Sequence, residues 1–218
     1  MKGIPRLVCV IGAFAMWGYG VPDITNVASA GLVFDLNTVH LTTNELASRR
    51  IRTLKVEGLT VYAFGTNSSP MELDVADMPT GKMKRTIFTA ARIDGNGYFV
   101  ALFAGLSGGV PGGLLRLSLS PHDNCIFTCY GGDIYGKEAQ PCEWLCYALT
   151  YDGDRIRIVV NSVSAGDMKR VLDTRQSPVV IGRIQNASGF IGAVKIWNRV
   201  LTDKEIGDIT KWHLEMLK

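Results

Sequence analysis

Three acidic residues lie close together in the segment Glu72-Leu73-Asp74-Val75-Ala76-Asp77. In an extended strand Glu72 and Asp74 share one face, whereas Asp77 points to the other. Two carboxyl groups about 5.5 Å apart can act as nucleophile and acid/base in the retaining hydrolysis of a glycosidic bond. The placement of Asp77, its short side chain and the lack of an adjoining tryptophan favour a simpler interpretation, acids on the solvated face of an edge strand. Retaining glycoside hydrolysis by Glu72 and Asp74 is therefore the third functional hypothesis.

A second group of residues that could bind a ligand lies in the segment 130–141, YGGDIYGKEAQP. This segment is longer than a tight hairpin needs, and loops at the rim of a sheet often carry recognition. Aromatic faces stack on sugar rings, and a carboxylate accepts hydrogen bonds from paired hydroxyls. Tyr130, Asp133 and Tyr135 are therefore the predicted glycan-binding residues. The alternative is a solvated turn whose tyrosines pack against the body of the protein.

Four of the five cysteines are placed symmetrically, in C-x-x-x-C segments that begin at Cys125 and Cys142. A hairpin of these segments would set Cys125 opposite Cys146 and Cys129 opposite Cys142 on one face. Residues four apart along a strand are separated by about 13 Å, so one zinc ion could not bind all four. Cross-strand disulfides would fit an oxidising compartment, and buried thiols would fit an intracellular assembly. We favour the thiols; Cys9 is left over.

The composition predicts a soluble, turn-rich globular protein, with 47% hydrophobic residues, 20% charged residues and 24 glycines among 218 residues. The net charge is only +3, and no basic cluster with interleaved aromatics is present, which argues against a nucleic-acid partner. His40, His122 and His213 are scattered, and no nucleophile motif or phosphate-binding loop accompanies them. The sequence therefore predicts that the protein is not an enzyme.

Several segments have the composition of β-strands, and turn-forming residues separate them. Strands are expected within 31–36, 60–64, 83–93, 98–106 and 114–119. The segment 94–97, Asp-Gly-Asn-Gly, predicts a hairpin between the third and fourth of these.

The C-terminal part predicts a buried strand that leads directly into a helix. Residues 189–197 form an apolar, β-branched run that contains two glycines. Thr202 and Glu205 have the spacing of a capping box, and Leu201 and Ile206 flank it at the spacing of a hydrophobic staple.

The segment 189–209, GFIGAVKIWNRVLTDKEIGDI, resembles the last strand and helix start of laminin-G-like and pentraxin-like domains of the concanavalin A-like lectin/glucanase superfamily. The segment 144–153, WLCYALTYDG, resembles a hairpin of the same domains. Ala187 departs from the family, which usually has an aromatic residue there; Phe190 is a candidate substitute. The resemblance implies an all-β fold for residues 31–218: a two-sheet antiparallel jelly-roll β-sandwich with a short C-terminal helix.

The resemblance also raises the question of calcium, since many of these domains hold a calcium ion at the rim. Asp94, Asn96, Asp152 and Asp154 could supply oxygen ligands. Each also lies in a turn, where Asp and Asn are expected for conformational reasons. We therefore predict no cofactor, with calcium as the alternative.

Residues 1–30 form a separate segment with two interpretations. Lys2 and Arg6 precede an apolar run, and Ala28-Ser29-Ala30 has the form of a signal cleavage site, which indicates a secretory leader. The rival interpretation is an uncleaved arm that docks on another subunit. Glycine and proline interrupt the apolar run, so a transmembrane anchor is not expected.

These observations favour a non-enzymatic recognition module that binds a glycan or a protein surface through loops at the sandwich rim. The alternative is a structural virion component, such as a phage decoration or fibre protein, that docks through its N-terminal arm. That alternative implies a homo-oligomer or a capsid or tail assembly. The expected location is extracellular or at a virion surface.

Overall fold

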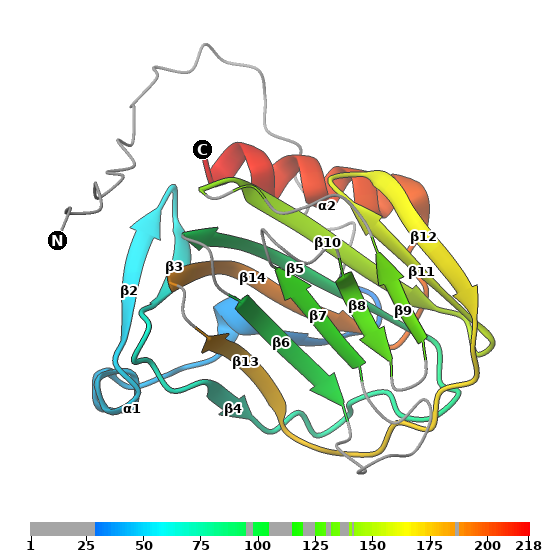
Figure 1. The fold of residues 1–218 in the computed structure, drawn as a ribbon, viewed down its shortest axis with the longest axis horizontal. Helices are drawn as coiled ribbons and strands as arrows, with labels where there is room; N and C mark the ends of the chain where they lie inside the picture. Colours follow the sequence, from blue (N-terminus) through cyan, green and yellow to red (C-terminus); the bar gives the residue numbers. More distant parts are fainter. Residues whose placement is uncertain are drawn as a thin grey trace, which may run out of the picture.

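The computed structural model describes residues 29–94, 98–104, 115–119, 125–129, 132–135, 140, 142–185 and 188–218. These residues form two antiparallel sheets packed face to face, with helix α2 outside the larger sheet (Figure 1). The larger sheet has the strand order β12-β11-β10-β5-β14-β3-β2, and β1 pairs with β14; the smaller has the order β4-β13-β6-β7-β8-β9. The predicted two-sheet antiparallel sandwich with a C-terminal helix is confirmed.

The strands of the larger sheet are β1 (Leu32–Asp35), β2 (Ile51–Val56), β3 (Leu59–Phe64), β5 (Arg85–Asp94), β10 (Trp144–Tyr151), β11 (Arg155–Val160), β12 (Val163–Lys169) and β14 (Ser188–Trp197). Those of the smaller sheet are β4 (Met71–Leu73), β6 (Tyr98–Ala104), β7 (Leu115–Leu119), β8 (Cys125–Cys129), β9 (Gly132–Tyr135) and β13 (Val179–Gln185). The helices are the 3₁₀ helix η1 (Leu36–Thr38), α1 (Thr43–Ser48) and α2 (Asp203–Met216).

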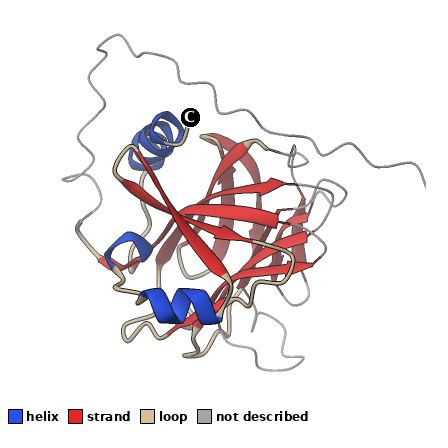
Figure 2. Ribbon diagram, turned by 90° about the vertical axis from the view of Figure 1, so that its left-hand side faces the viewer, coloured by secondary structure: helices blue, strands red, loops and turns tan. Residues whose placement is uncertain are grey.

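Strand β14 lies inside the larger sheet and is covered on both faces. Ile191 and Ile196 point into the apolar cluster between the two sheets. Ala193 and Trp197 belong to a second cluster, which Ile209 and other residues of α2 complete. Helix α2, next to the C-terminus marked in Figure 2, lies outside the sheets. Burial on both faces explains why the strand is apolar almost throughout.

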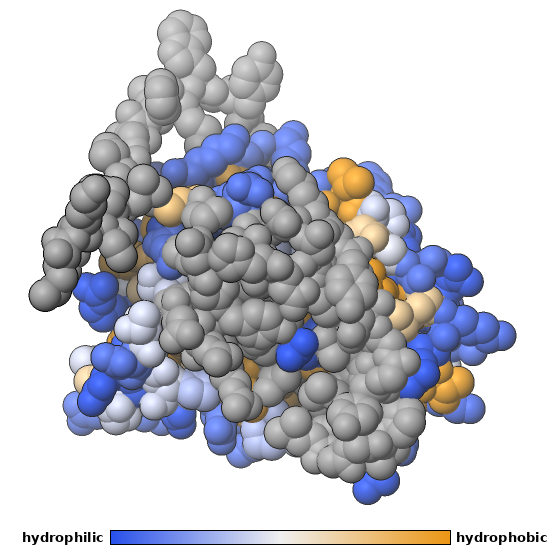
Figure 3. Space-filling model, viewed as in Figure 1, coloured by the Kyte–Doolittle hydropathy of each residue, from blue (hydrophilic) through white to orange (hydrophobic). Residues whose placement is uncertain are grey.

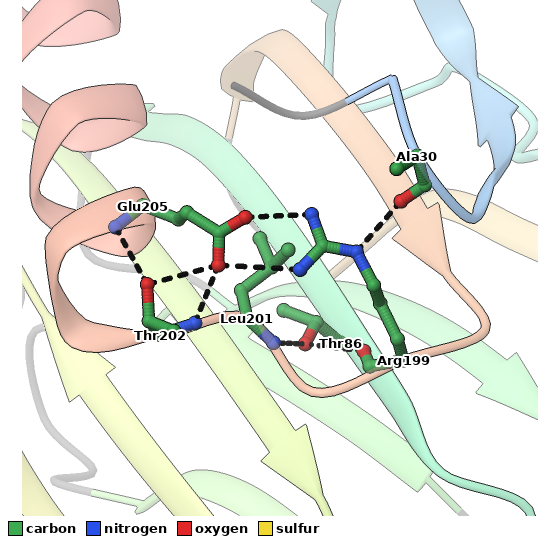
Figure 4. A network of polar contacts seen from close by, with 6 residues as sticks. All are labelled: Ala30, Thr86, Arg199, Leu201, Thr202 and Glu205. Atoms are coloured by element: carbon green, nitrogen blue, oxygen red, sulfur yellow. Dashed lines mark hydrogen bonds and ion pairs between the residues drawn. The ribbon is translucent and has the colours of Figure 1, made fainter. Parts of the chain in front are cut away.

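The turn between β14 and α2 is held by a polar network (Figure 4). Thr202 Oγ1 accepts a hydrogen bond from the Glu205 backbone amide at 3.3 Å, and Glu205 Oε2 accepts one from the Thr202 amide at 2.7 Å, as the predicted capping box requires. Arg199 binds both carboxylate oxygens of Glu205, at 2.6 and 3.2 Å, and donates to Ala30 O at 2.7 Å. The predicted staple residues Leu201 and Ile206 are both buried.

The predicted hairpin across residues 94–97 is wrong. Strand β5, which ends at Asp94, pairs with β10 and β14 in the larger sheet. Strand β6 pairs with β7 and β13 in the smaller sheet. The chain therefore passes from the larger to the smaller sheet between Asp94 and Tyr98. A turn signal fixes the change of direction but not the strand with which the returning chain pairs.

The predicted pairing of the two cysteine segments is also wrong. Strand β8, with Cys125 and Cys129, pairs with β7 and β9, whereas β10, with Cys146, belongs to the other sheet. Cys146 is a buried free thiol on the outer face of the larger sheet, and burial raises the pKa of this thiol. Cys142 is disulfide-bonded. The favoured buried thiol is thus correct for Cys146 and wrong for Cys142.

Candidate functional site

The structure places two of the three predicted glycan-binding residues but does not test their role. Tyr130 lies outside the described residues. Asp133 and Tyr135 lie in β9 at the edge of the smaller sheet, opposite Thr128 and Cys125, and their side chains are outside the described part. The segment 132–135 is thus a strand rather than a loop, and the binding role of these three residues remains a prediction.

The candidate hydrolase residues lie on an edge strand, as the simpler interpretation expects. Strand β4 is at the edge of the smaller sheet, where it pairs with β13, and it ends at Leu73. Glu72 and Asp74 are both exposed. The strand that would align the two carboxylates therefore stops between them.

Three of the four candidate calcium ligands have protein partners that account for their positions. Asp94 forms an ion pair with Arg92. Asp152 accepts hydrogen bonds from backbone amides two and three residues further on, and these bonds lower the pKa of its carboxyl group. Asp154 forms an exposed ion pair, and Asn96 is not described. The described residues contain no group of three or more His, Cys, Asp or Glu side chains that could hold a metal ion.

A hollow of about 840 Å³, here called the rim groove, lies where α1, β2, β3, β14 and the end of β5 meet. Its lining includes Arg50, Arg52, Ala63, Asp94 and Phe190. Its volume falls within the range of about 300–1,000 Å³ that small-molecule sites occupy. It is therefore large enough for a ligand of one or a few rings.

The rim groove arises from a row of side chains that crosses four pairs of neighbouring strands. Arg52 is opposite Ala63, Ala63 opposite Phe190, Phe190 opposite Arg92, and Arg92 opposite Trp144. Directly opposed residues in antiparallel strands project from the same face. The small Ala63 between two large side chains leaves a hollow in the row.

The aromatic wall of the rim groove is held in place by an arginine. The Arg92 guanidinium lies 4.4 Å from the ring centre of Phe190 and 5.5 Å from that of Trp144. Arg92 Nε is also 3.1 Å from Asp94 Oδ1. Stacking and ion pairing together fix the guanidinium, which in turn orients Phe190.

The rim groove carries a positive charge. Arg50 and Arg52 are exposed and line the groove. Neither has an ion-pair partner among the residues that the structure describes. The Asp94 carboxylate is already neutralised by Arg92. An aromatic wall next to two unpaired guanidinium groups can bind a ring that bears an anionic group.

Sequence reasoning did not find this site because its residues come from four separated strands. Phe190 was singled out as a substitute for a missing family aromatic, and Asp94 as a possible calcium ligand, but nothing linked the two. Arg50 and Arg52 lie in a stretch whose strand edges no local pattern marks. An alternation of charged and apolar residues around Ile51 was the available signal, but it indicates only an edge strand.

The two-sheet architecture and the outer C-terminal helix define a lectin-like jelly-roll sandwich. Residues 74–207 match the family model described as the concanavalin A-like lectin/glucanases superfamily, a laminin-G type. This match covers more than half of the chain, and the chain belongs to that superfamily.

Solved structures with a similar fold share little sequence with this chain. The binding domain of Paraclostridial Mosquitocidal Protein 1 matches with a TM-score of 0.62 at 12% identity, over 83% of this chain and 52% of that one. The receptor binding domain of botulinum neurotoxin D matches with a TM-score of 0.59 at 9% identity, over 83% and 52%. A Trypanosoma rangeli sialidase matches with a TM-score of 0.60 at 16% identity, over 84% and 33%.

The present chain thus spans about half or less of the proteins it resembles, and the likeness shows the fold. No curated protein sequence matches significantly. None of the described helices is long and apolar enough to span a membrane.

Proposed function

We propose that this chain is a non-enzymatic recognition domain that binds an acidic glycan in the rim groove. The observation that carries the proposal is the combination of Phe190, held by Arg92, with the unpaired Arg50 and Arg52 around one hollow. A sugar ring would pack its C–H face on Phe190, and its carboxylate or sulfate would accept hydrogen bonds from the guanidinium groups.

Two further observations support a binding role outside the cell. The fold matches two toxin domains that are described as binding domains. The disulfide at Cys142 fits an oxidising compartment, because disulfides are rare in reducing ones. The extracellular location and the glycan partner predicted from the sequence are therefore retained within the proposal.

The test is binding of the full chain to an array of neutral and acidic glycans. We expect hits among the acidic members, with affinity that falls as salt is added, since exposed charges are screened. Arg52→Glu should weaken binding by about tenfold or more, the cost of losing a charge-assisted contact.

Lys55→Glu is the matched control, because Lys55 is exposed on the same strand but does not line the rim groove. It should leave the affinity unchanged. An array without acidic hits, or equal losses for Arg52→Glu and Lys55→Glu, would contradict the proposal.

A further inference from the structure

A second cavity, here called the helix pocket, lies beneath α2 on the outer side of the larger sheet and measures about 330 Å³. It is bounded by α2, by the end of β14 and by the segment from β1 to η1. Its polar lining residues are Ser29, Asp35, Asn37, Lys195 and His213, and Trp197 and Trp212 are among its apolar ones. The helix pocket and the rim groove share no lining residue.

His213 presents a buried acceptor without a partner. Its side chain is fully buried, and Nδ1 lies 2.8 Å from Ile209 O. Because a backbone carbonyl can only accept, Nδ1 carries the proton and Nε2 of the neutral ring is an acceptor. Phe88 and Trp212 hold the ring, with centroids 4.9 and 4.7 Å from its own. Nε2 has no hydrogen-bond partner among the described residues.

Asn37 presents a second such acceptor. Its Nδ2 donates to Gly192 O at 3.3 Å, and this bond fixes which end of the amide is the donor. Oδ1 at the other end is buried and has no partner in the described part of the chain. A buried acceptor without a donor destabilises the fold, so two such residues in the lining of one cavity call for an occupant that supplies donors.

The two charged side chains that line the helix pocket, Lys195 and Asp35, compensate each other's charge. Lys195 Nζ pairs with Asp35 Oδ2, and the two side chains are only 15% and 12% exposed. Asp35 Oδ1 also accepts from the backbone amide of Asn37 at 3.0 Å. An ionic ligand would therefore meet no uncompensated charge here, and a neutral one fits better.

We infer that the helix pocket binds one neutral polyhydroxyl ligand, a single sugar ring. Its hydroxyls donate to His213 Nε2 and Asn37 Oδ1, and its C–H face packs against Trp212. The pocket lies at the small end of the range for ligand sites, which suits one ring rather than a chain. This site stands apart from the rim groove, which is positive and open to larger acidic ligands.

The test uses the full chain and follows the ring nitrogens of His213 by NMR while D-glucose, D-galactose, N-acetyl-D-glucosamine or glycerol is added. We expect at least one sugar to shift the Nε2 resonance saturably in the millimolar range. Asn37→Leu, which removes one acceptor, should weaken that binding by about tenfold.

Ser29→Trp provides a second variant that leaves every polar partner in place. Ser29 is exposed and lines the helix pocket, so a tryptophan there should block entry without changing the melting temperature. Arg52→Glu, in the rim groove, should leave the response intact, which separates this inference from the proposed function.

Two outcomes would overturn the inference. One is no saturable shift with any of the four probes, as expected if ordered water alone fills the cavity. The other is a shift that persists unchanged in both Ser29→Trp and Asn37→Leu.

Discussion

At the scale of single residues, Arg85 shows how this fold treats a polar group that it buries for structure. The side chain is fully buried, yet its guanidinium donates to three backbone carbonyls within 79–83 and to Thr174 Oγ1, at 2.5–3.0 Å. Burial lowers the pKa of Arg85 to about 10, so it remains charged at neutral pH. Arg85 thus has a partner at each of its three nitrogens, whereas His213 Nε2 and Asn37 Oδ1 have none among the described residues.

The packing around Gly182 leaves no room for a side chain. It has a φ of +80°, and a Cβ at this position would lie 2.2 Å from Cε1 of Phe64, a core residue only 2% exposed. Gly182→Ala should lower the free energy of unfolding by about 3 kcal/mol or more, through backbone strain and overpacking together. Urea denaturation monitored by tryptophan fluorescence measures the loss.

Gly207 is the matched control for that substitution. It lies inside α2, and a Cβ there would meet no atom within 4 Å. Gly207→Ala should raise the free energy of unfolding by about 0.5–1 kcal/mol, because glycine is a poor helix former. A stability loss at both positions, or at neither, would contradict this assignment of the two glycines.

At the scale of elements, two capping boxes of the same type allow the contribution of Arg199 to be isolated. Glu205 caps α2 and also binds Arg199, and these contacts, led by the Arg199 hydrogen bond, lower the pKa of Glu205 to about 2. Glu205→Gln should reduce the free energy of unfolding by about 2 kcal/mol, the range for hydrogen bonds to charged groups. Thermal denaturation by circular dichroism measures it.

The capping box of α1 is the comparison. Glu45 and Thr42 exchange the same hydrogen bonds as Glu205 and Thr202, but Glu45 is exposed. Glu45→Gln should cost clearly less than Glu205→Gln. Equal losses would show that the cap alone, without Arg199, accounts for the stability at α2.

The capping box of α2 was predictable because all its signals lie within a few residues of each other. The same holds for the strand 188–197, whose apolar run reports that both faces are covered. Strand pairing was not predictable in this way: β5 pairs with β10 and β14, which follow it by about fifty and a hundred residues. The cysteine register and the rim groove both depend on such distant pairings. Local patterns therefore predicted several of the elements, and the family resemblance predicted the two layers, but neither found the site that the layers assemble.

At the scale of the whole molecule, two apolar clusters lie on opposite faces of the larger sheet. On the face shown in Figure 3, the described surface is mostly hydrophilic. The exposed large apolar residues are scattered along the chain; Val163, for example, is 69% exposed. Stability therefore depends on the two interior clusters. The outer one depends on α2, whose His213 is packed against Phe88 of the sheet. A charge on His213 would thus act on the attachment of the helix.

The pH dependence of unfolding tests that attachment. Burial, the main cause, lowers the pKa of His213 to about 4 from its ordinary 6.5, while Lys195 lowers it further and Asp35 opposes the shift. Between these values the unfolded chain binds a proton that the folded chain does not. The contribution of His213 to the free energy of unfolding should therefore be complete above pH 6.5. The free energy of unfolding should fall by roughly 3 kcal/mol as the pH drops to about 4.

His213→Phe keeps an aromatic ring between Phe88 and Trp212 but cannot titrate. Urea denaturation of both proteins at a series of pH values should give a shallower decline for the variant over this window. Glu205, with a pKa of about 2, loses its contribution only at lower pH and is present in both proteins. The difference between the two curves therefore isolates the imidazole. Parallel curves would mean that the pKa of His213 is the same in the folded and the unfolded chain, and that the imidazole does not couple the attachment of α2 to pH.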